Sequence, residues 1–282
     1  MERKRIAIVG VGLIGGSLAL QLHEKKISSR LIGVESNKEH AQKALELELV
    51  DEILPLEVAI EQADVIVLAI PVDSTLELLQ VILDKIGNKV LIDVGSAKEQ
   101  LINAVTGHAR RGRYVSTHPM WGTEYSGPAA AVKGAFENKA VIIINAGDSD
   151  ADALAWTKSM YKKIGMHLLE MNASDHDLHA AYVSHISHIT SFALANTVLE
   201  KEKEKQAIFE LASAGFASTV RLAKSNPAMW VPIFMQNRKH VLDVLEEHIA
   251  QLIKFKGTIE QGDEKKLKSL IEEANKIRKI IE

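Results

Sequence analysis

The chain has 282 residues, of which 46% are apolar and 25% are charged, proportions that are ordinary for a folded globular protein long enough to form two domains. The net charge of −3 and the lack of a strongly basic block give no reason to expect nucleic acid or an anionic membrane as a partner. The sequence has no cysteine, which excludes disulfides, thiolate metal sites and a cysteine nucleophile. It has neither an apolar run of membrane-spanning length nor a predicted signal peptide, so we expect a cytoplasmic protein.

A glycine-rich stretch near the N-terminus, KRIAIVGVGLIGGSL, predicts a dinucleotide-binding turn. A β-branched apolar run, Arg5–Val9, predicts a strand buried on both faces, and a GxGxxG turn joins it to an expected helix, Ser17–His23. In such a turn the first glycine permits the tight bend, the second lets backbone approach a pyrophosphate, and the third lets the helix pack on the strand. The N-terminus of the helix offers N–H groups and a positive dipole end to the phosphates. The residues predicted to bind the cofactor in this turn are Gly10, Gly12, Leu13, Ile14 and Gly15.

An acidic residue downstream favours NAD as the dinucleotide. The second predicted strand, Leu31–Val34, ends in Glu35, about twenty residues after the last glycine of the turn. A carboxylate there accepts hydrogen bonds from both ribose hydroxyls of the adenosine half and repels the 2′-phosphate of NADP. The alternative is a solvated glutamate at a strand end, with no ligand.

Strands and helices alternate with short connections as far as about residue 171. The further predicted strands are Asp64–Ile70, Lys89–Val94, Tyr114–Thr117, Lys139–Asn145 and Met166–Leu169. The further predicted helices are Asn37–Glu46, capped by Asn37, Asp73–Lys85 and Asp150–Lys163. This alternation indicates an α/β domain with a doubly wound parallel sheet. Ligands bind beyond the carboxyl ends of such strands, so Ile70 and Pro71 are further cofactor-binding candidates.

From Asn172 onward the periodicity is helical only. The predicted helices are Ala173–Glu200, Gln206–Ala214, Ser218–Ala223, Pro227–Ile253 and Asp263–Ile281. We therefore expect a dinucleotide-binding domain of residues 1–171 and an all-α domain of residues 172–282. Because no flexible linker separates them, the two domains are expected to pack rigidly against each other.

One histidine stands where a general base is needed. His118 follows the predicted strand Tyr114–Thr117 and precedes Pro119, which stiffens the backbone at the edge of the sheet where the nicotinamide is expected. A neutral imidazole there can take a proton from a substrate hydroxyl while hydride leaves the same carbon. The alternative is a structural histidine, which is the commoner role of a single imidazole.

Four further histidines lie close together in the stretch SDHDLHAAYVSHISH. On a regular α-helix His185 and His188 project about 60° apart, while His176 and His179 face the opposite side. One helix therefore cannot bring all four to one ion, and we expect no metal site. His185 and His188, on one face toward the cofactor domain, suit an anionic substrate.

Two other polar residues have both a structural and a functional interpretation. Ser96 follows the strand Lys89–Val94 and can cap the next helix, which by itself is the simpler interpretation. Arg221 lies among apolar residues after a glycine turn, where it is either a surface arginine or a buried clamp for a carboxylate. Its apolar setting favours the clamp.

At these motifs the sequence resembles the prephenate dehydrogenase family, also called TyrA, and its arogenate dehydrogenase relatives. The stretches that agree in order and spacing are GVGLIGGS, DVGSAKE, STHPMWGTEYSGP, VSHISH and AGFASTVRLAKSNPAMW. The resemblance implies a Rossmann-type domain followed by an all-α domain that forms a homodimer. It also implies the activity, which is NAD-dependent oxidative decarboxylation of prephenate to 4-hydroxyphenylpyruvate in tyrosine biosynthesis.

The resemblance implies roles for individual residues. His118 corresponds to the catalytic histidine that hydrogen-bonds the ring hydroxyl, and Ser96 to the serine that helps to orient it. Arg221 corresponds to the arginine that binds a substrate carboxylate. The remaining implied pocket residues are His185, His188 and Trp230, the last corresponding to a tryptophan that the partner subunit contributes.

Two departures from the family pattern leave arogenate as an alternative substrate. Ala217 stands where some members carry a lysine, and Trp121 stands where many have a small residue. Either change can alter the preference between a keto and an amino side chain. No segment for a chorismate mutase or ACT domain is expected, so any inhibition by tyrosine is expected to compete at the active site.

Two other classes of protein remain as alternatives. A β-hydroxyacid dehydrogenase needs a catalytic lysine followed by a helical asparagine, and Lys224 with Asn226 matches that spacing poorly. A non-enzymatic NAD-binding sensor would leave His118, Ser96 and Arg221 without a purpose.

Overall fold

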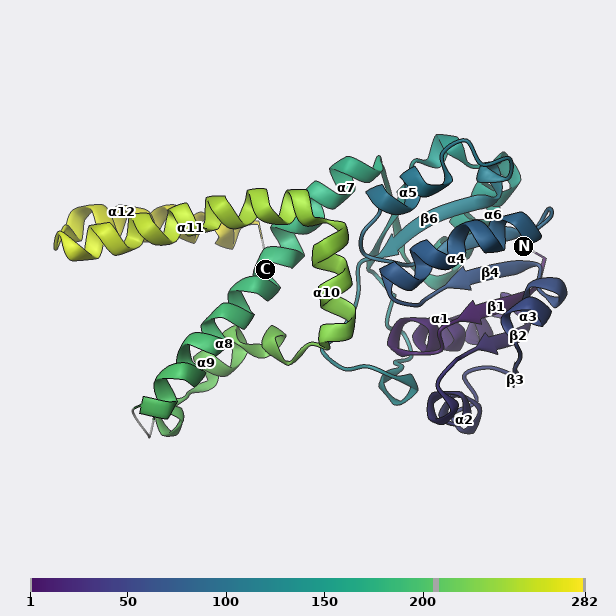
Figure 1. The fold of residues 1–282 in the computed structure, drawn as a ribbon, viewed down its shortest axis with the longest axis horizontal. Helices are drawn as coiled ribbons and strands as arrows, with labels where there is room; N and C mark the ends of the chain where they lie inside the picture. The colour runs from purple at the N-terminus through teal and green to yellow at the C-terminus, as the bar shows by residue number, and fades with distance from the viewer. Residues whose placement is uncertain (1, 205–207, 281–282) are drawn as a thin grey trace.

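The computed structural model describes residues 2–204 and 208–280. Figure 1 shows an α/β part that contains the sheet and a helical part beside it. Helix α10 (Pro227–Gln236) lies next to the α/β part, whereas α8 (Ile186–Glu204) and the pair α11 (Arg238–Glu260) and α12 (Glu264–Ala274) project away from it. Within the described residues, no helix is both long enough and apolar enough to cross a membrane.

The strands of the described residues form one sheet of eight in the order β3-β2-β1-β4-β5-β6-β7-β8. Their bounds are β1 Lys4–Val9, β2 Ser28–Val34, β3 Glu52–Ile53, β4 Val65–Leu68, β5 Val90–Asp93, β6 Tyr114–Pro119, β7 Ala140–Ile144 and β8 His167–Met171. The strands from β3 to β6 are parallel, and the chain reverses its direction of travel across the sheet between β1 and β4. This topology confirms the doubly wound fold and puts a ligand crevice beyond the ends of β1 and β4.

The predicted parallel sheet contains one antiparallel pairing, beyond which β7 and β8 run parallel to each other and opposite to the other strands. β7 runs antiparallel to β6, with His118 opposite Ile142. A parallel connection requires a crossover, usually a helix, but the segment between these strands contains only a short 3-10 turn, Pro128–Ala130. The chain therefore turns back, and β7 begins at the edge of the sheet where β6 ends.

Helices cover both faces of the sheet, which explains the continuous apolar runs of its strands. Ile6 and Ile8 of β1 pack on one face with residues of α1 and α6, while Ala7 and Val9 pack on the other with residues of α3, α4 and α5. The helices of this part are α1 Leu13–Glu24, α2 Lys38–Glu46, α3 Leu56–Gln62, α4 Val72–Lys85, α5 Glu99–Val105 and α6 Ala151–Ile164. The cap of α2 by the Asn37 side chain is confirmed, whereas the short elements β3 and α3 were not predicted.

The helical part begins with one long helix that contains a π turn. α7 (Ala173–Ala180) continues through the π turn Ala181–His185 into α8, where a single regular helix, Ala173–Glu200, was predicted. A π turn accommodates one residue more than an α turn, so it rotates everything that follows relative to a regular helix. This rotation matters for the histidines described below.

Three further helix predictions differ from the structure. The helix predicted over Gln206–Ala214 begins outside the described residues. Its described portion contains the 3-10 turn Phe209–Leu211 instead of a helix. The chain is extended at Ser213, and α9 (Ala214–Thr219) begins after it. The helix predicted over Pro227–Ile253 is broken at Asn237, whose side chain bonds to α7 and the π turn. The last predicted helix, Asp263–Ile281, is α12 followed by the 3-10 turn Asn275–Lys279, and its final residue lies outside the described ones.

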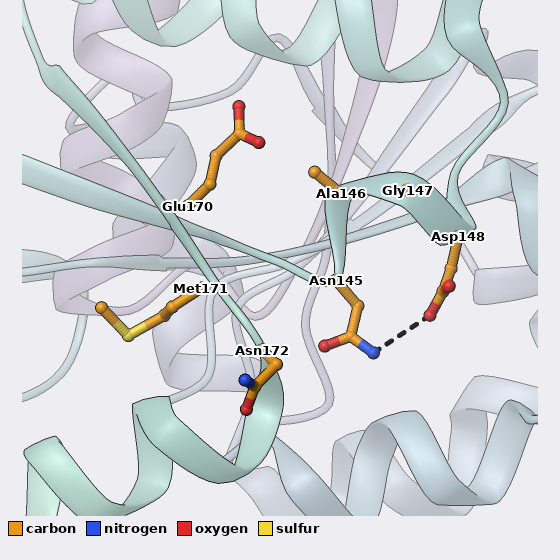
Figure 2. A pocket seen from close by; sticks show the side chains of 7 residues that line it. All are labelled: Asn145, Ala146, Gly147, Asp148, Glu170, Met171 and Asn172. Carbon is orange, nitrogen blue, oxygen red and sulfur yellow. Dashed lines mark hydrogen bonds between the residues drawn. The ribbon is translucent and has the colours of Figure 1, made fainter.

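A tight corner passes the chain from the sheet to the helices. Asn145, in the left-handed conformation with φ of 47°, donates its backbone N–H to Met171, and its side-chain oxygen accepts the N–H of Ala173 at 3.0 Å. The corner borders an open hollow of about 300 Å³. Figure 2 shows its lining residues, among which Asn145 donates to Asp148. These bonds join the end of β8 to the start of α7.

Candidate active site

The glycine turn has the geometry of a dinucleotide site. Gly10 has φ of +90°, and a β-carbon there would lie 2.6 Å from the carbonyl oxygen of Ala69. A β-carbon on Gly15 would collide with the carbonyl oxygen of Gly10, so the strand and helix pack as closely as the motif predicts. At Gly12 nothing lies within 4 Å of a β-carbon position, which leaves open space for a ligand to approach the backbone.

The N-terminus of α1 fits an anionic ligand. α1 begins at Leu13, four residues earlier than predicted, no side chain caps it, and its first turn contains no acidic residue. The N–H groups of that turn, including those of Leu13 and Ile14, have no partner within the helix. Ile70 and Pro71, the other cofactor candidates, follow β4, and Cγ2 of Ile70 lies 2.7 Å from the position of a β-carbon on Gly10, so this loop lies against the turn. This arrangement supplies donors for a pyrophosphate.

Glu35 lies at the end of β2, half-buried beside the glycine turn. Its carboxylate accepts the N–H of Val11 at 3.2 Å and the N–H of Asn37 at 3.0 Å. These bonds hold the carboxylate at the rim of the crevice, where an adenosine ribose lies in doubly wound folds. The residues of the turn and Glu35 therefore fit NAD.

His118 lies at the carboxyl end of β6 and contacts the helical part. Its Nδ1 lies 2.8 Å from Nε2 of His176 on α7, and the two rings meet edge to face with centroids 5.0 Å apart. Burial lowers the pKa of His118 well below 6.5, and the nearby His176, Lys98 and His185 lower it further. The imidazole is therefore neutral at neutral pH, as a general base must be.

The second histidine is in turn joined to a buried carboxylate. Nδ1 of His176 lies 2.8 Å from Oδ1 of Asp177, and both residues are 1% exposed. The two oxygens of Asp177 also accept the backbone N–H of Lys98, at 2.9 and 3.1 Å, and Oδ2 accepts the N–H of Glu99 at 2.9 Å. A residue of the helical part thus caps the N-terminus of α5 in the α/β part.

Because Asp177 caps α5, the interpretation of Ser96 as the cap of that helix is wrong. Ser96 is half-buried in the loop between β5 and α5, but the N-cap position of α5 is occupied by Lys98 and its N–H groups bond to Asp177. The cap comes from a segment about eighty residues away, which no local pattern announces. Ser96 is therefore not the capping residue.

A buried lysine network lies beneath His118. Nζ of Lys98, which is 0% exposed, donates to Oδ2 of Asp93 at 2.5 Å and to the carbonyl oxygen of Thr117 at 2.6 Å. Oδ1 of Asp93 accepts the hydroxyls of Tyr114 and Ser116, each at 2.7 Å. Burial lowers the pKa of Lys98, and the carboxylate of Asp93 opposes that change. The network ties β5 to β6, but sequence analysis did not identify it.

The structure contradicts the prediction that His176 faces away from His185. Nine residues on a regular helix would separate the two by about 180°, but the extra residue of the π turn removes about 100° of that angle. Both therefore face the α/β part, and the charge of one lowers the pKa of the other. His179 is exposed, and its Nδ1 lies within hydrogen-bond distance of the carbonyl oxygen of Asp175 in its own helix.

His185, His188 and Trp230 form one aromatic cluster. The ring of His188 stacks on Trp230 with centroids 3.4 Å apart, and His185 meets Trp230 edge to face at 6.0 Å. His185 also lies 3.2 Å from Nδ2 of Asn237, and burial lowers its pKa to about 4. Trp230, 7% exposed, packs on Val72 of α4 within the same chain.

Arg221 differs from the buried clamp predicted for it. It lies in a 3-10 turn, Arg221–Lys224, where its side chain is 52% exposed and Nη1 bonds to Oε2 of Glu124 at 2.9 Å. Glu124 belongs to the loop after β6, beside a hollow of about 520 Å³. The charge of Arg221 lowers the pKa of His188, so the guanidinium lies on the same side of the helical part as the cluster.

The two departures from the family pattern lie in different settings. Trp121 meets Phe136 edge to face at 5.4 Å and packs against the core of the α/β part. Ala217 is exposed on α9, in the turn before Arg221. Within the described residues, no group of three or more histidine and acidic side chains is arranged to hold a metal ion.

Comparison with known proteins agrees with this geometry. The family model described as prephenate dehydrogenase, nucleotide-binding domain, matches residues 18–170, and the one described as prephenate dehydrogenase, dimerization domain, matches residues 172–273. Prephenate dehydrogenase of Bacillus subtilis (strain 168) is 32% identical over 266 residues, which cover 93% of this chain and 72% of the relative. Cyclohexadienyl dehydrogenase of Zymomonas mobilis is 29% identical over 278 residues, covering 98% and 95%.

Solved structures give the same result. Prephenate dehydrogenase from A. aeolicus, in complex with hydroxyphenyl propionate and NAD+, superposes with a TM-score of 0.89 at 27% identity and covers 100% of this chain and 99% of its own. Synechocystis arogenate dehydrogenase superposes with a TM-score of 0.75 at 27% identity, covering 98% and 99%. With both of its parts matched, the chain belongs to the prephenate dehydrogenase family.

Proposed function

We propose that the chain is an NAD-dependent prephenate dehydrogenase, which converts prephenate to 4-hydroxyphenylpyruvate and CO2. The observation that carries the proposal is His118, a half-buried neutral imidazole at the carboxyl edge of the sheet. Its Nδ1 is held by His176, and its Nε2 makes no hydrogen bond to any described residue. A base with one nitrogen fixed and the other free suits removal of a proton from a bound hydroxyl.

The cofactor would be held by the glycine turn and Glu35. The N–H groups at the start of α1 would bind the pyrophosphate, and the Glu35 carboxylate would accept the ribose hydroxyls. When bound, NAD+ supplies the acceptor for the hydride that leaves C4 of the substrate ring. Ile70 and Pro71, in the loop after β4 beside the turn, would border the bound cofactor.

His118 would act twice on the proton of the substrate hydroxyl. Its Nε2 takes that proton as the C4–O bond becomes a carbonyl and the C4 hydride departs. Loss of the ring carboxylate as CO2 then leaves its bonding electrons in the ring, which becomes aromatic. The phenolate oxygen takes the proton back from His118, so the imidazole ends neutral. Ser96, half-buried in the adjacent loop, would help to orient the hydroxyl.

The substrate dianion needs cationic and donor groups on the helical part. Arg221 is half-exposed and bonded to a single carboxylate oxygen of Glu124, so a substrate carboxylate can replace that partner. His185 and His188, held by Trp230 and Asn237, would line the ring pocket. Each of these groups lies on the side of the helical part that faces His118 or its loop.

Arogenate remains a second candidate substrate, because relatives of both kinds match the full chain. These relatives include a cyclohexadienyl dehydrogenase and an arogenate dehydrogenase. Ala217 is exposed near Arg221 and offers no charge to a keto or an amino side chain. A direct comparison of turnover with prephenate and with arogenate therefore decides between the two substrates.

We also propose that residues 1–171 and 172–282 are two domains and that the second forms a homodimer. Its family model is a dimerization domain, and α11 and α12 extend from the rest of the chain with apolar side chains exposed. On these helices they are Leu242, Ile249, Leu252, Ile253, Ile259 and Ile271. Burial of such a surface against a second copy stabilises an obligate dimer. Sedimentation equilibrium of the purified chain tests this: a monomer at micromolar concentration would contradict it.

The activity is tested with the purified chain, NAD and each substrate in parallel. Formation of reduced cofactor is followed by absorbance, and 4-hydroxyphenylpyruvate or tyrosine is identified as the product. We expect a higher kcat/KM with prephenate and NAD than with arogenate or NADP. A chain that reduces no cofactor with either substrate would contradict the proposal.

A further inference from the structure

We infer that His176 and Asp177 are positioning residues that keep a proton on Nδ1 of His118 and leave its Nε2 unprotonated toward the substrate. The inference rests on the proposed function in taking His118 as the base. It concerns a chain of hydrogen bonds that runs from α5 through α7 to β6. Which atom donates and which accepts in each of these hydrogen bonds follows from the first of the side chains, the carboxylate of Asp177.

The first member can only be an acceptor. The carboxylate of Asp177 receives two backbone N–H groups, those of Lys98 and Glu99, which have no capacity to accept. A carboxylate has acceptor oxygens and no donor, so it accepts from every partner. The contact of 2.8 Å with His176 therefore requires a proton on Nδ1 of His176.

The next two bonds follow from the chemistry of neutral imidazole, which has one donor nitrogen and one acceptor nitrogen. With Nδ1 of His176 protonated, its Nε2 is the acceptor for Nδ1 of His118, 2.8 Å away. Nδ1 of His118 therefore carries the proton, and Nε2 keeps the lone pair. Burial and the neighbouring Lys98 disfavour a second proton on either ring.

The same carboxylate also joins the two parts of the chain. Asp177 and His176 lie on α7 of the helical part, whereas Lys98, Glu99 and His118 belong to the α/β part. The tautomer of the base is therefore correct only when α7 is docked on α5. When His118 becomes an imidazolium, its Nδ1–H bond to His176 stays as it is, and the negative charge of Asp177 stabilises the new charge.

Asp177→Asn tests the inference with almost no change of shape. The single amide oxygen is needed by the N–H groups of Lys98 and Glu99, so the amide NH2 then faces His176 and reverses the chain of donors. His118 would carry its proton on Nε2, where it cannot act as a base. We expect kcat to fall about 10²- to 10⁴-fold, as for other bases held in the wrong tautomer, with KM little changed.

Nitrogen NMR of the chain labelled with 15N-histidine reads the tautomer directly, without substrate or cofactor. We expect the His118 Nε2 signal, assigned by its loss in His118→Asn, to be of the unprotonated type in the parent and of the protonated type in Asp177→Asn. A protonated Nε2 in the parent would overturn the inference even if the chain is an active dehydrogenase. An inactive chain with an unprotonated Nε2 would instead reject the proposed function alone.

Gln100→Ala is the matched control. It removes another bond between the two parts, from Nε2 of Gln100 to the carbonyl oxygen of Gln236 at 2.9 Å, and leaves the histidines untouched. We expect its kcat and its His118 signal to equal those of the parent. If Asp177→Asn lowers only the melting temperature, leaving the tautomer and kcat unchanged, Asp177 is merely a helix cap and the inference fails.

His176→Leu keeps the inference testable if Asp177→Asn does not fold. It removes the acceptor for the Nδ1–H of His118 while Asp177 still caps α5. We expect a mixture of His118 tautomers, seen as a shifted Nε2 signal, and a loss of kcat. A His118 signal identical to that of the parent would overturn the inference.

Discussion

Nδ1 of His118 lies 2.8 Å from Nε2 of His176, so a strand of the α/β part and a helix of the helical part share a hydrogen bond between two imidazoles. Asp177 extends this bond to the N-terminus of α5. The proposed base is thus positioned by both parts of the molecule. Changes at the contact between them are expected to affect the reaction as well as stability.

Replacing the base is expected to slow the chemical step. In His118→Asn we expect kcat to fall about 10²- to 10⁴-fold with KM little altered, because general-base assistance acts in the transition state. Steady-state kinetics with prephenate and NAD measure both constants. His179→Asn, an exposed histidine on α7, is the control and should behave as the parent. Near-full kcat in His118→Asn would remove the assignment.

The ion pair of Arg221 and Glu124 is expected to compete with substrate. Arg221→Ala should raise KM for prephenate about 10- to 100-fold, the loss of one charge-assisted bond of about 1.5–3 kcal/mol. Glu124→Gln should lower that KM, because it weakens the partner that the substrate replaces. Lys224→Ala, in the same turn, is the control and should leave the KM for prephenate unchanged. An unchanged KM in Arg221→Ala would mean that the carboxylate binds elsewhere.

Glu35 is expected to set the preference for NAD. Glu35→Ser removes the acceptor for the ribose hydroxyls and the charge that repels a 2′-phosphate, so KM for NAD should rise and KM for NADP should fall. The ratio of kcat/KM for the two cofactors measures the effect. Glu39→Ser, in the exposed first turn of α2, is the matched control. A ratio that does not move would refute the ribose role.

The buried lysine is expected to matter for stability. Lys98→Met leaves the Asp93 carboxylate buried without its cation and should lower the free energy of unfolding by about 3–5 kcal/mol. Urea denaturation measures the change. Adding Asp93→Asn should recover part of the loss, because no unpaired charge then remains. Lys85→Met, at the exposed end of α4, should have little effect, and an equally small effect of Lys98→Met would contradict the prediction.

The free energy of unfolding is expected to fall in acid, because the unfolded chain binds protons at histidines that stay neutral in the folded chain. His185 has a pKa of about 4 in the folded chain against an ordinary value of 6.5, so the unfolded state takes up the proton first as pH falls. Its contribution is complete above pH 6.5, is lost between pH 6.5 and 4, and amounts to about 2 kcal/mol between pH 7 and 5. His118 and His176 act in the same direction. His185→Asn should therefore lose less stability over that interval, and an unchanged pH dependence would contradict the prediction.

The sequence by itself determined the features that depend on neighbouring residues. The spacing of Gly10, Gly12 and Gly15 predicts the turn, because each glycine meets a local steric demand. Continuous apolar runs predict strands buried on both faces, and the change of period near Asn172 predicts where the sheet ends. His118 could be placed at a strand end for the same reason.

Only the tertiary structure decided which side chains meet. The cap of α5 by Asp177, the bond between His118 and His176, and the pair of Arg221 with Glu124 each join segments that are far apart in the chain. Such contacts depend on the rotation of a helix and the direction of a strand. One extra residue in the π turn rotates His185 by about 100° relative to His176, and hydrophobic periodicity carries no sign of it.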